Sequence, residues 1–241
     1  MILEVDSVTK RFRGLAAVKD VSFAVAPCSI FGLMGANGAG KTTIFSMIAG
    51  NERPSSGTIR FNGRPIQGLR PWRISRLGIA RTFQIVRPFP GITVRENVTL
   101  AALYGAGGEA SPTVARRLAD DILEEVGLAA QSSTEARQLT LAARKRLEIA
   151  RALGAKPKLL LLDEVLAGLT PTEVSSAVEL LRHVHRRYSL TIVMVEHVLR
   201  ALMQLCTKIV VLHHGEKIAE GAPDAVSADP VVVQAYFGGR P

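Results

Sequence analysis

The segment Ser29–Gly35 reads Ser-Ile-Phe-Gly-Leu-Met-Gly, and Gly35-Ala36-Asn37-Gly38-Ala39-Gly40-Lys41-Thr42 continues from its last residue. These eight residues match the phosphate-loop pattern G-x-x-x-x-G-K-[ST] in full. The apolar run before them predicts a short buried strand, and a helix is expected from about Lys41 to Ile48, ending at Gly50. In that context the glycines let backbone N–H groups converge on phosphate oxygens at the positive end of the helix.

The loop predicts two specific contacts. Lys41 is expected to reach the β- and γ-phosphates of ATP, and Thr42 to offer its hydroxyl to Mg²⁺. Thr43, the next residue of the helix, is included in the predicted nucleotide site. A Gly-rich turn with an incidental lysine is the alternative, which the strand–loop–helix context disfavours.

A second apolar run ends in two carboxylates, Leu159-Leu160-Leu161-Leu162-Asp163-Glu164. Such a strand delivers its acidic residues to the carboxyl edge of a parallel sheet, where ligands bind in α/β folds. Asp163 is the expected Mg²⁺ ligand, and Glu164 is expected to polarise the attacking water. An apolar run followed by two acidic residues is common by itself. In a chain that also contains a phosphate loop, it is the expected second half of the nucleotide site.

Strands and helices are predicted to alternate around these motifs. Further strands are expected at 21–25, 58–62, 158–162, 190–195 and 209–212, and helices at 172–187 and 197–205. This alternation indicates a parallel sheet covered by helices. Between Pro71 and Gly154 helical periods dominate, with Leu118, Ile122, Leu123 and Val126 on one helix face before Gly127.

Composition narrows the cellular context. The 241 residues are 47% hydrophobic, yet no stretch approaches the ~18–20 apolar residues of a spanning helix. Charged residues interrupt the first eleven positions, so no signal peptide is predicted and the protein is expected to be soluble and cytosolic. Cys28 and Cys206 are expected to be free, buried thiols. The net charge of +9 is compatible with nucleic acid, anionic lipid or a phosphorylated ligand as a partner. Lys and Arg are expected to be spread along the chain, so a disordered basic tail is not predicted.

The order and spacing of the motifs resemble those of ABC-transporter ATPases. The resemblance rests on the phosphate loop, Gln84 after Thr82-Phe83, Leu162-Asp163-Glu164, His197 after the strand ending at Glu196, and Arg146–Leu153, which looks like the helix after the family's signature sequence. It implies that Gln84 touches Mg²⁺ and the attacking water, that His197 contacts the γ-phosphate, and that Phe12 stacks on adenine. Without the other motifs, His197 would be interpreted as a strand-end histidine with a local hydrogen bond, and the alternative for Phe12 is a core aromatic.

The resemblance also implies an architecture. The expected fold class is α/β: a P-loop NTPase core with a mostly parallel sheet, a small N-terminal antiparallel β part and an inserted helical subdomain. Residues 1–241 would form a single ABC ATPase domain, with 1–84 and 157–241 as the nucleotide-binding core and 85–156 as the helical subdomain with the signature segment. The stretch Gln84–Asn97 is expected to hold the permease-docking surface. Its apolar residues are Ile85, Val86, Phe89, Ile92 and Val94. The alternative is that these side chains pack inside the domain.

The signature segment departs from the family pattern. Where most members read Leu-Ser-Gly-Gly-Gln, this chain reads Leu139-Thr140-Leu141-Ala142-Ala143. Thr140 keeps a hydroxyl for a γ-phosphate, but both glycines and the glutamine are replaced. Val165 stands where proline is usual, and Thr170 where aspartate is typical.

Within the family, the chain looks most like the ATP-binding subunits of branched-chain amino-acid importers. The residues that carry this similarity are Ala80–Gln84, Arg146–Arg151, Ala167-Gly168-Leu169 and the C-terminal run from Asp229-Pro230 to Ala235-Tyr236-Phe237-Gly238. Lipopolysaccharide-export ATPases look alike at several of these places and remain an alternative, as do a soluble non-transport ABC ATPase and a simple nucleotide kinase.

The resemblance implies the partners as well. They would be transmembrane permease subunits and a second ATP-binding subunit, as a heterodimer or a homodimer. Nucleic acid is not expected, and the membrane would be contacted only through the permease. The protein would therefore lie in the cytoplasm, peripheral on the inner face of the cell membrane.

Overall fold

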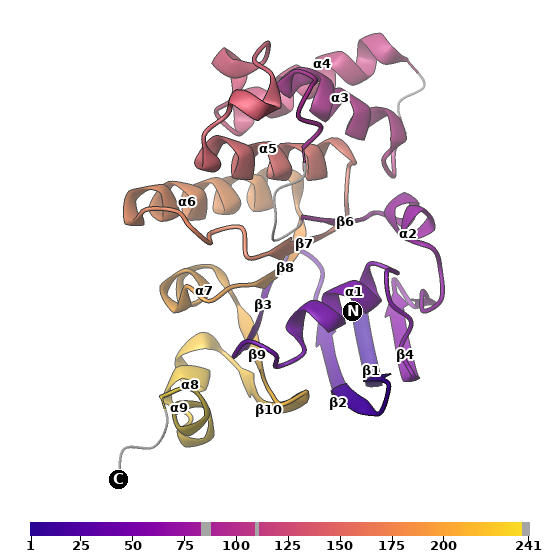
Figure 1. Ribbon diagram of the computed structural model, residues 1–241, viewed down its shortest axis with the longest axis vertical. Helices are drawn as coiled ribbons and strands as arrows, with labels where there is room; N and C mark the ends of the chain where they lie inside the picture. The colour runs from indigo at the N-terminus through magenta and orange to yellow at the C-terminus, as the bar shows by residue number, and fades with distance from the viewer. Residues whose placement is uncertain (83–87, 109–110, 238–241) are drawn as a thin grey trace. The chain divides into compact units, whose positions relative to one another are not determined.

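The computed structural model describes residues 1–82, 88–108 and 111–237. The chain forms two compact units, one built from Met1–Ile74 with Thr191–Pro241 and the other from Ser75–Leu190. Figure 1 labels their elements in chain order. The division into 1–84 with 157–241 and 85–156 stays a prediction.

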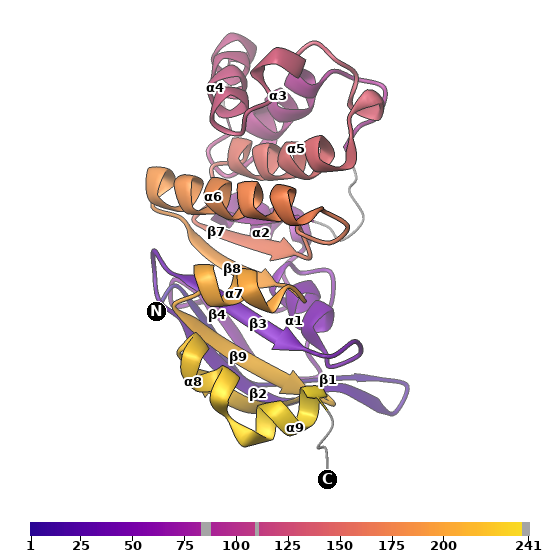
Figure 2. The same ribbon diagram turned by 90° about the vertical axis from the view of Figure 1, so that its left-hand side faces the viewer.

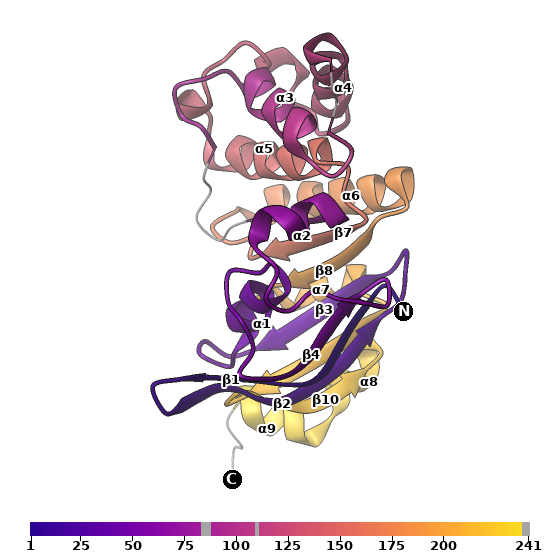
Figure 3. The same ribbon diagram turned by 90° about the vertical axis from the view of Figure 1, so that its right-hand side faces the viewer.

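The first unit contains a small antiparallel sheet with strand order β2-β1-β4-β5. Its strands are β1 (Leu3–Phe12), β2 (Leu15–Val25), β4 (Ser56–Phe61) and β5 (Arg64–Pro65). Val5 of β1 pairs with Phe23 on one side and Ile59 on the other, and all three side chains are buried. Figure 3 shows β1, β2 and β4 side by side. Alternation along the strands thus gives this sheet one buried face.

A second set of strands in the first unit carries the phosphate loop. β3 (Ile30–Gly35) lies in parallel between β8 (Thr191–Val195) and β9 (Lys208–His213), and β10 (Glu216–Gly221) pairs antiparallel with β9. All residues of β3 and β8 are buried, which explains their continuous apolar sequence. Helix α1 (Lys41–Ile48) follows β3, and α7 (Leu199–Leu205) follows β8.

The C-terminal helices complete the first unit. α8 (Pro223–Ala228) and α9 (Pro230–Phe237) pack against β10, and α8 also against β9 (Figure 2). At Gly32 an added Cβ would lie 3.0–3.3 Å from the side chains of Ile209, Cys206 and Leu202, so a larger residue there would require these side chains to shift. Helix α2 (Pro71–Leu77) spans the sequence junction of the two units.

The second unit combines a short parallel strand pair with helices. β6 (Ile79–Arg81) pairs with β7 (Leu159–Asp163), placing Arg81 opposite Leu161. The helices are α3 (Val94–Tyr104), α4 (Pro112–Glu125), α5 (Leu141–Gly154) and α6 (Pro171–Tyr188), with single 3-10 turns at Ala129–Gln131 and Ala136–Gln138. Capping boxes at Thr93 with Glu96 and at Thr170 with Glu173 fix the starts of α3 and α6. In each box the main-chain N–H and the hydroxyl of the Thr donate hydrogen bonds to the Glu carboxylate, and these bonds hold the pKa of Glu96 and of Glu173 below the usual value.

The predicted strands and helices are confirmed to within about two residues at each end, except that the strand expected at 21–25 begins earlier, at Leu15. The burial of Ile122, Leu123 and Val126, with Gly127 at φ 71°, confirms the helix face and its terminator. One expectation is wrong: Cys206 is buried, but Cys28 is exposed in a turn at φ 53°, where its N–H donates to Thr191 Oγ1 at 3.0 Å. Across the described residues, no helix is long and apolar enough to cross a membrane.

Candidate nucleotide site

The phosphate loop bridges the end of β3 and the start of α1. Gly38 and Gly40 have φ values of 80° and 103°, a region open to glycine and rarely adopted by other residues. A Cβ at Gly40 would lie 2.5 Å from the Ala17 carbonyl oxygen, and a Cβ at Gly35 would lie 2.7 Å from that of Leu212. The glycine spacing is therefore required by backbone packing as well as by torsion angles.

Lys41 is folded over its own loop. Its Nζ donates to the carbonyl oxygens of Gly35 at 2.6 Å and of Ala36 at 2.9 Å, and the residue is only 5% exposed. Ala36, Asn37 and Gly38 are exposed, Ala39 and Gly40 are buried, and the helix continues with exposed Thr42 and half-buried Thr43. The first unit thus gathers a lysine ammonium, loop N–H groups and a hydroxyl at one helix N-terminus, which is a phosphate-binding arrangement.

The carboxyl end of β7 in the second unit presents Asp163, which is 2% exposed. Its Oδ2 accepts a hydrogen bond from Arg81 Nη2 at 2.7 Å, and its N–H donates to Thr82 Oγ1 at 3.1 Å. Its Oδ1 is buried and has no hydrogen-bond partner within the described parts of the chain. A buried carboxylate oxygen left over in this way fits a hard cation such as Mg²⁺.

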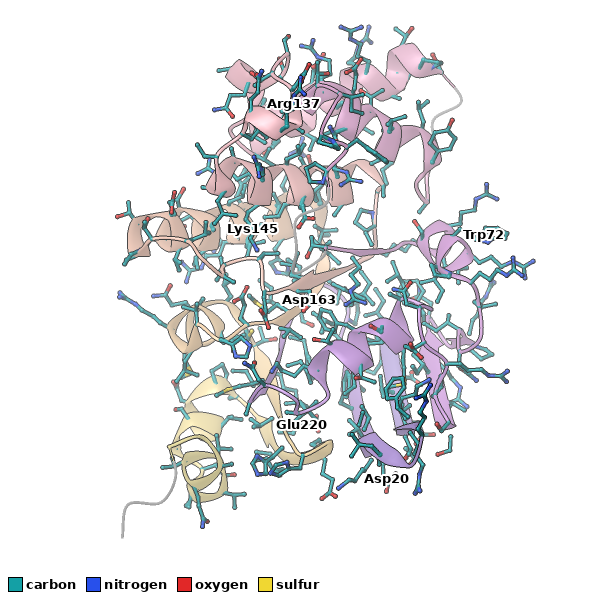
Figure 4. All side chains as sticks on the ribbon, in the orientation of Figure 1. Asp20, Trp72, Arg137, Lys145, Asp163 and Glu220 are labelled. Carbon is teal, nitrogen blue, oxygen red and sulfur yellow. The ribbon has the colours of Figure 1, made fainter. Side chains whose placement is uncertain are left out.

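Glu164 begins the loop after β7 in a left-handed backbone conformation, with φ 51°. Its carbonyl oxygen accepts a hydrogen bond from the buried Lys145 Nζ at 2.9 Å and another from the N–H of Ala167 at 3.2 Å. A non-glycine residue at positive φ requires support from its surroundings. Lys145, from the helix α5, is part of that support. Figure 4 labels Lys145 and Asp163.

The remaining predicted residues lie at exposed positions. Phe12 ends β1 at 42% exposure, with Lys10 Nζ 4.7 Å from its ring centroid. His197 is exposed in a bend after β8. Thr140 is the N-cap of α5, where its Oγ1 accepts from the N–H of Ala143 at 3.3 Å, and Leu141 beside it is 46% exposed. Gln84 lies outside the described residues.

The comparisons with known proteins decide the family. The sequence pattern of the ABC transporter family matches residues 18–167. The branched-chain amino acid transport ATP-binding protein BraF of Pseudomonas aeruginosa is 36% identical, over 98% of each chain. This chain belongs to the ABC transporter family. It is an ATP-binding subunit of the branched-chain amino acid type, whose own family pattern matches residues 216–240.

Further relatives agree with the assignment. LivG of Escherichia coli is 35% identical over 98% of each chain. LptB of Haemophilus influenzae, a lipopolysaccharide export ATP-binding protein, is 34% identical over 98% of this chain and 97% of its own. A solved ATP-binding cassette in its ADP conformation is similar with a TM-score of 0.87 at 28% identity, covering 99% of each chain. The predicted fold class and ATP hydrolysis by this ABC-type subunit are thereby confirmed.

Two residues of the site were absent from the sequence prediction: Arg81 and Lys145. Both are far in sequence from the residues that they hold, 82 and 19 positions away. Arg81 precedes Thr82-Phe83-Gln84, and Lys145 belongs to the helix after the signature segment. Arg81 lies inside Ala80–Gln84, which carries the family resemblance, and Lys145 lies between the signature segment and Arg146–Leu153. A charged residue inside or beside such a motif is the signal that could have found them.

Proposed function

We propose that this subunit couples ATP hydrolysis to the import of branched-chain amino acids or related small polar solutes. The observation that carries the proposal is the similarity over 98% of the chain to proteins that are named for branched-chain amino acid transport. The family pattern at residues 216–240 supports the same direction. The export of lipopolysaccharide is the second candidate, favoured by the 34% identity to LptB.

We propose that the residues of the phosphate loop bind ATP through distinct contacts. The N–H groups of the loop from Gly35 to Thr42 hold the β- and γ-phosphates, with Thr43 completing the site. When ATP binds, the Lys41 ammonium exchanges its hydrogen bonds to the carbonyl oxygens of Gly35 and Ala36 for hydrogen bonds to the phosphate oxygens. The lysine is already held over the loop by these two hydrogen bonds, at the place where the phosphates are proposed to bind.

Mg²⁺ is proposed as the cofactor beside ATP. Asp163 would hold it through the buried Oδ1, together with the hydroxyl of Thr42 and the amide of Gln84. When bound, the ion neutralises charge on the phosphate oxygens. Glu164 is proposed to polarise the attacking water, His197 to contact the γ-phosphate and Phe12 to stack on adenine through its exposed ring.

The partners of an ABC transporter ATP-binding subunit are permease chains and a second cassette. We propose that the permease docks on the stretch Gln84–Asn97. Phe89 is 52% exposed and lies under the guanidinium of Arg151, and the buried Asn97 side chain holds the loop through both main-chain groups of Phe89. Val94 is fully buried and contributes to the core instead. Ile92 is half-buried, and Ile85 and Val86 lie outside the described residues.

We further propose that the subunit lies in the cytoplasm, peripheral on the inner face of the membrane, and that its partner cassette is a different chain. Reconstitution tests the function. The subunit, its permease and the second cassette are assembled in proteoliposomes and supplied with a substrate-binding protein and ATP. Uptake of leucine, isoleucine or valine that requires hydrolysis is the expected result. Extraction of lipopolysaccharide without amino-acid uptake would establish the export alternative.

A further inference from the structure

The whole net charge of the chain is concentrated in one segment. Residues 53–95 contain nine arginines and no lysine, aspartate or glutamate, so the rest of the chain has 21 basic and 21 acidic residues. Basic residues are spread along the chain as expected, and the excess arises because this segment contains no acidic residue. A one-sign segment of this length indicates an anionic partner.

Five residues of this segment belong to the first unit and are here called the arginine patch: Arg53, Arg64, Arg70, Trp72 and Arg73. All five residues are exposed, Trp72 at 51% of its surface. The Arg73 guanidinium lies 5.1 Å from the centre of the Trp72 ring. Figure 4 labels Trp72, which projects outward among other nitrogen-tipped side chains.

The backbone under the arginine patch is firmly packed. A Cβ at Gly50 would lie 2.6 Å from both the Leu69 carbonyl oxygen and Ile74 Cδ1, so the start of α2 sits directly on the end of α1. The side chain of Arg53 passes over Gly68, with Nε 3.7 Å from the position of an added Cβ. The backbone that carries Arg70 and Arg73 is therefore packed in place without a ligand, which lowers the cost of ordering on binding.

Acidic neighbours do not neutralise it. Glu52, the nearest acid in sequence, forms its ion pair with Lys10 at 2.7 Å. Arg60 lies opposite Glu4 in the pairing of β1 with β4 and is not counted in the patch. Within the described ranges, none of the four patch arginines forms an ion pair with a carboxylate.

We infer that the arginine patch binds anionic phospholipid headgroups at the membrane surface beside the permease. Guanidinium groups form paired hydrogen bonds with phosphate oxygens, and tryptophan is enriched at the headgroup level because its ring is apolar with one polar N–H. An ATP-binding subunit of a membrane transporter works next to this surface. The inference rests on the peripheral location proposed above, and it adds a direct lipid contact to the contact through the permease.

Vesicle binding tests the inference. The full chain is sedimented with vesicles of phosphatidylcholine, or of phosphatidylcholine mixed with phosphatidylglycerol. The variant Arg70→Gln with Arg73→Gln is compared with Arg116→Gln with Arg117→Gln, which removes two exposed arginines of α4 and thus the same charge. Each basic residue near an anionic surface strengthens binding about fivefold, so the patch variant should bind the anionic vesicles about 25-fold more weakly.

The controls separate the possible outcomes. The α4 variant should keep most of its vesicle binding, and Trp72→Ala should weaken it without any change of charge. Equal losses in the patch and α4 variants would overturn the inference, and so would equal binding to neutral vesicles. Loss of permease association by the patch variant in purely zwitterionic lipid would identify an acidic protein partner instead. Fluorescent ATP binding, measured in parallel, tests the nucleotide site independently of the patch.

Discussion

Glu164 is the residue on which the proposed hydrolysis depends. Glu164→Gln removes the carboxylate proposed to polarise water, but it keeps the size of the side chain and the main-chain carbonyl that accepts a hydrogen bond from Lys145. Turnover by the assembled transporter should fall by about 10²-fold or more, while ATP affinity stays unchanged. Lys41→Ala is the contrasting variant, because losing the ammonium should weaken ATP binding itself. Near-normal turnover of Glu164→Gln would show that another group is the base.

Arg81 and Asp163 form a buried ion pair whose side chains are 10% and 2% exposed. Removing one member of such a pair leaves the other charge buried and uncompensated. Arg81→Gln should lower stability by about 3 kcal/mol, or the thermal midpoint by roughly 6–12 °C for a chain of this size. The midpoint is followed by circular dichroism without Mg²⁺.

Two variants control for this effect. Arg187→Gln removes an arginine that is 64% exposed and pairs with Glu125 at 3.5 Å, and it should cost under about 1 kcal/mol. Arg81→Lys keeps the charge and should recover part of the loss. Mg²⁺ with nucleotide should stabilise Arg81→Gln more than the unaltered chain, since a cation then compensates Asp163. Equal midpoints for Arg81→Gln and Arg187→Gln would contradict the role of the pair.

The two cysteines should differ sharply in reactivity. Burial raises the pKa of the Cys206 thiol to about 12, so at pH 8 almost none of it is the reactive thiolate. Because this pKa is raised, the native thiol stays protonated across the whole pH range below that value. Cys28 is exposed. Iodoacetamide at pH 8 should label Cys28 alone, as read by peptide mass spectrometry, and label both in denaturant. Native labelling of Cys206 would show that the core around Gly32 opens.

At the scale of elements, α5 connects the signature segment to the loop that begins at Glu164 in the same chain. Thr140 caps this helix, and Lys145 one turn further holds the Glu164 carbonyl. Lys145→Met should lower kcat about tenfold with little change in KM, because it releases the left-handed backbone at Glu164 without touching nucleotide. Lys145→Arg should retain most of the rate.

Arg146→Gln is the matched control for Lys145. The side chain of Arg146 donates to Ser176 Oγ at 2.8 Å on α6 and does not reach Glu164. Its kcat should therefore stay near that of the unaltered chain. A similar fall in kcat for both variants, or a rise in KM for Lys145→Met, would mean that α5 is only structurally required.

The elements of the fold could be predicted because their signals are local. Continuous apolar runs mark β3, β7 and β8, and Gly40 at the start of α1 and Gly127 after α4 mark helix ends. The contacts of Arg81 could not be predicted, since they depend on the pairing of β6 with β7 that sets Arg81 opposite Leu161. The exposure of Cys28 could not be predicted either, because it follows from a turn at positive φ that residue type alone does not reveal.

For the whole molecule, the signature segment predicts unequal ATP sites in a transporter with two different cassettes. In such transporters each ATP lies between the phosphate loop of one cassette and the signature segment of the other. Here Leu141 and Ala142 replace glycines at the N-terminus of α5, and Leu141 is 46% exposed where a phosphate would approach. Added side chains restrict that approach, and losing one donor of this kind lowers a rate about 10²–10³-fold.

This chain's own phosphate loop, Asp163, Glu164 and His197 retain the family's residues and would act against the partner's signature segment. Glu164→Gln in this subunit should therefore reduce transporter turnover far more than the same change in the partner cassette. ATPase rates of the two singly altered complexes, each purified with one tagged cassette, measure the difference. Equal losses in the two complexes, or full activity of this chain without a partner, would contradict unequal sites. Restoring glycine at Leu141 and Ala142 should raise the rate of the weaker site and reduce the difference, because it removes the two Cβ groups that hold the phosphate away from the helix N-terminus.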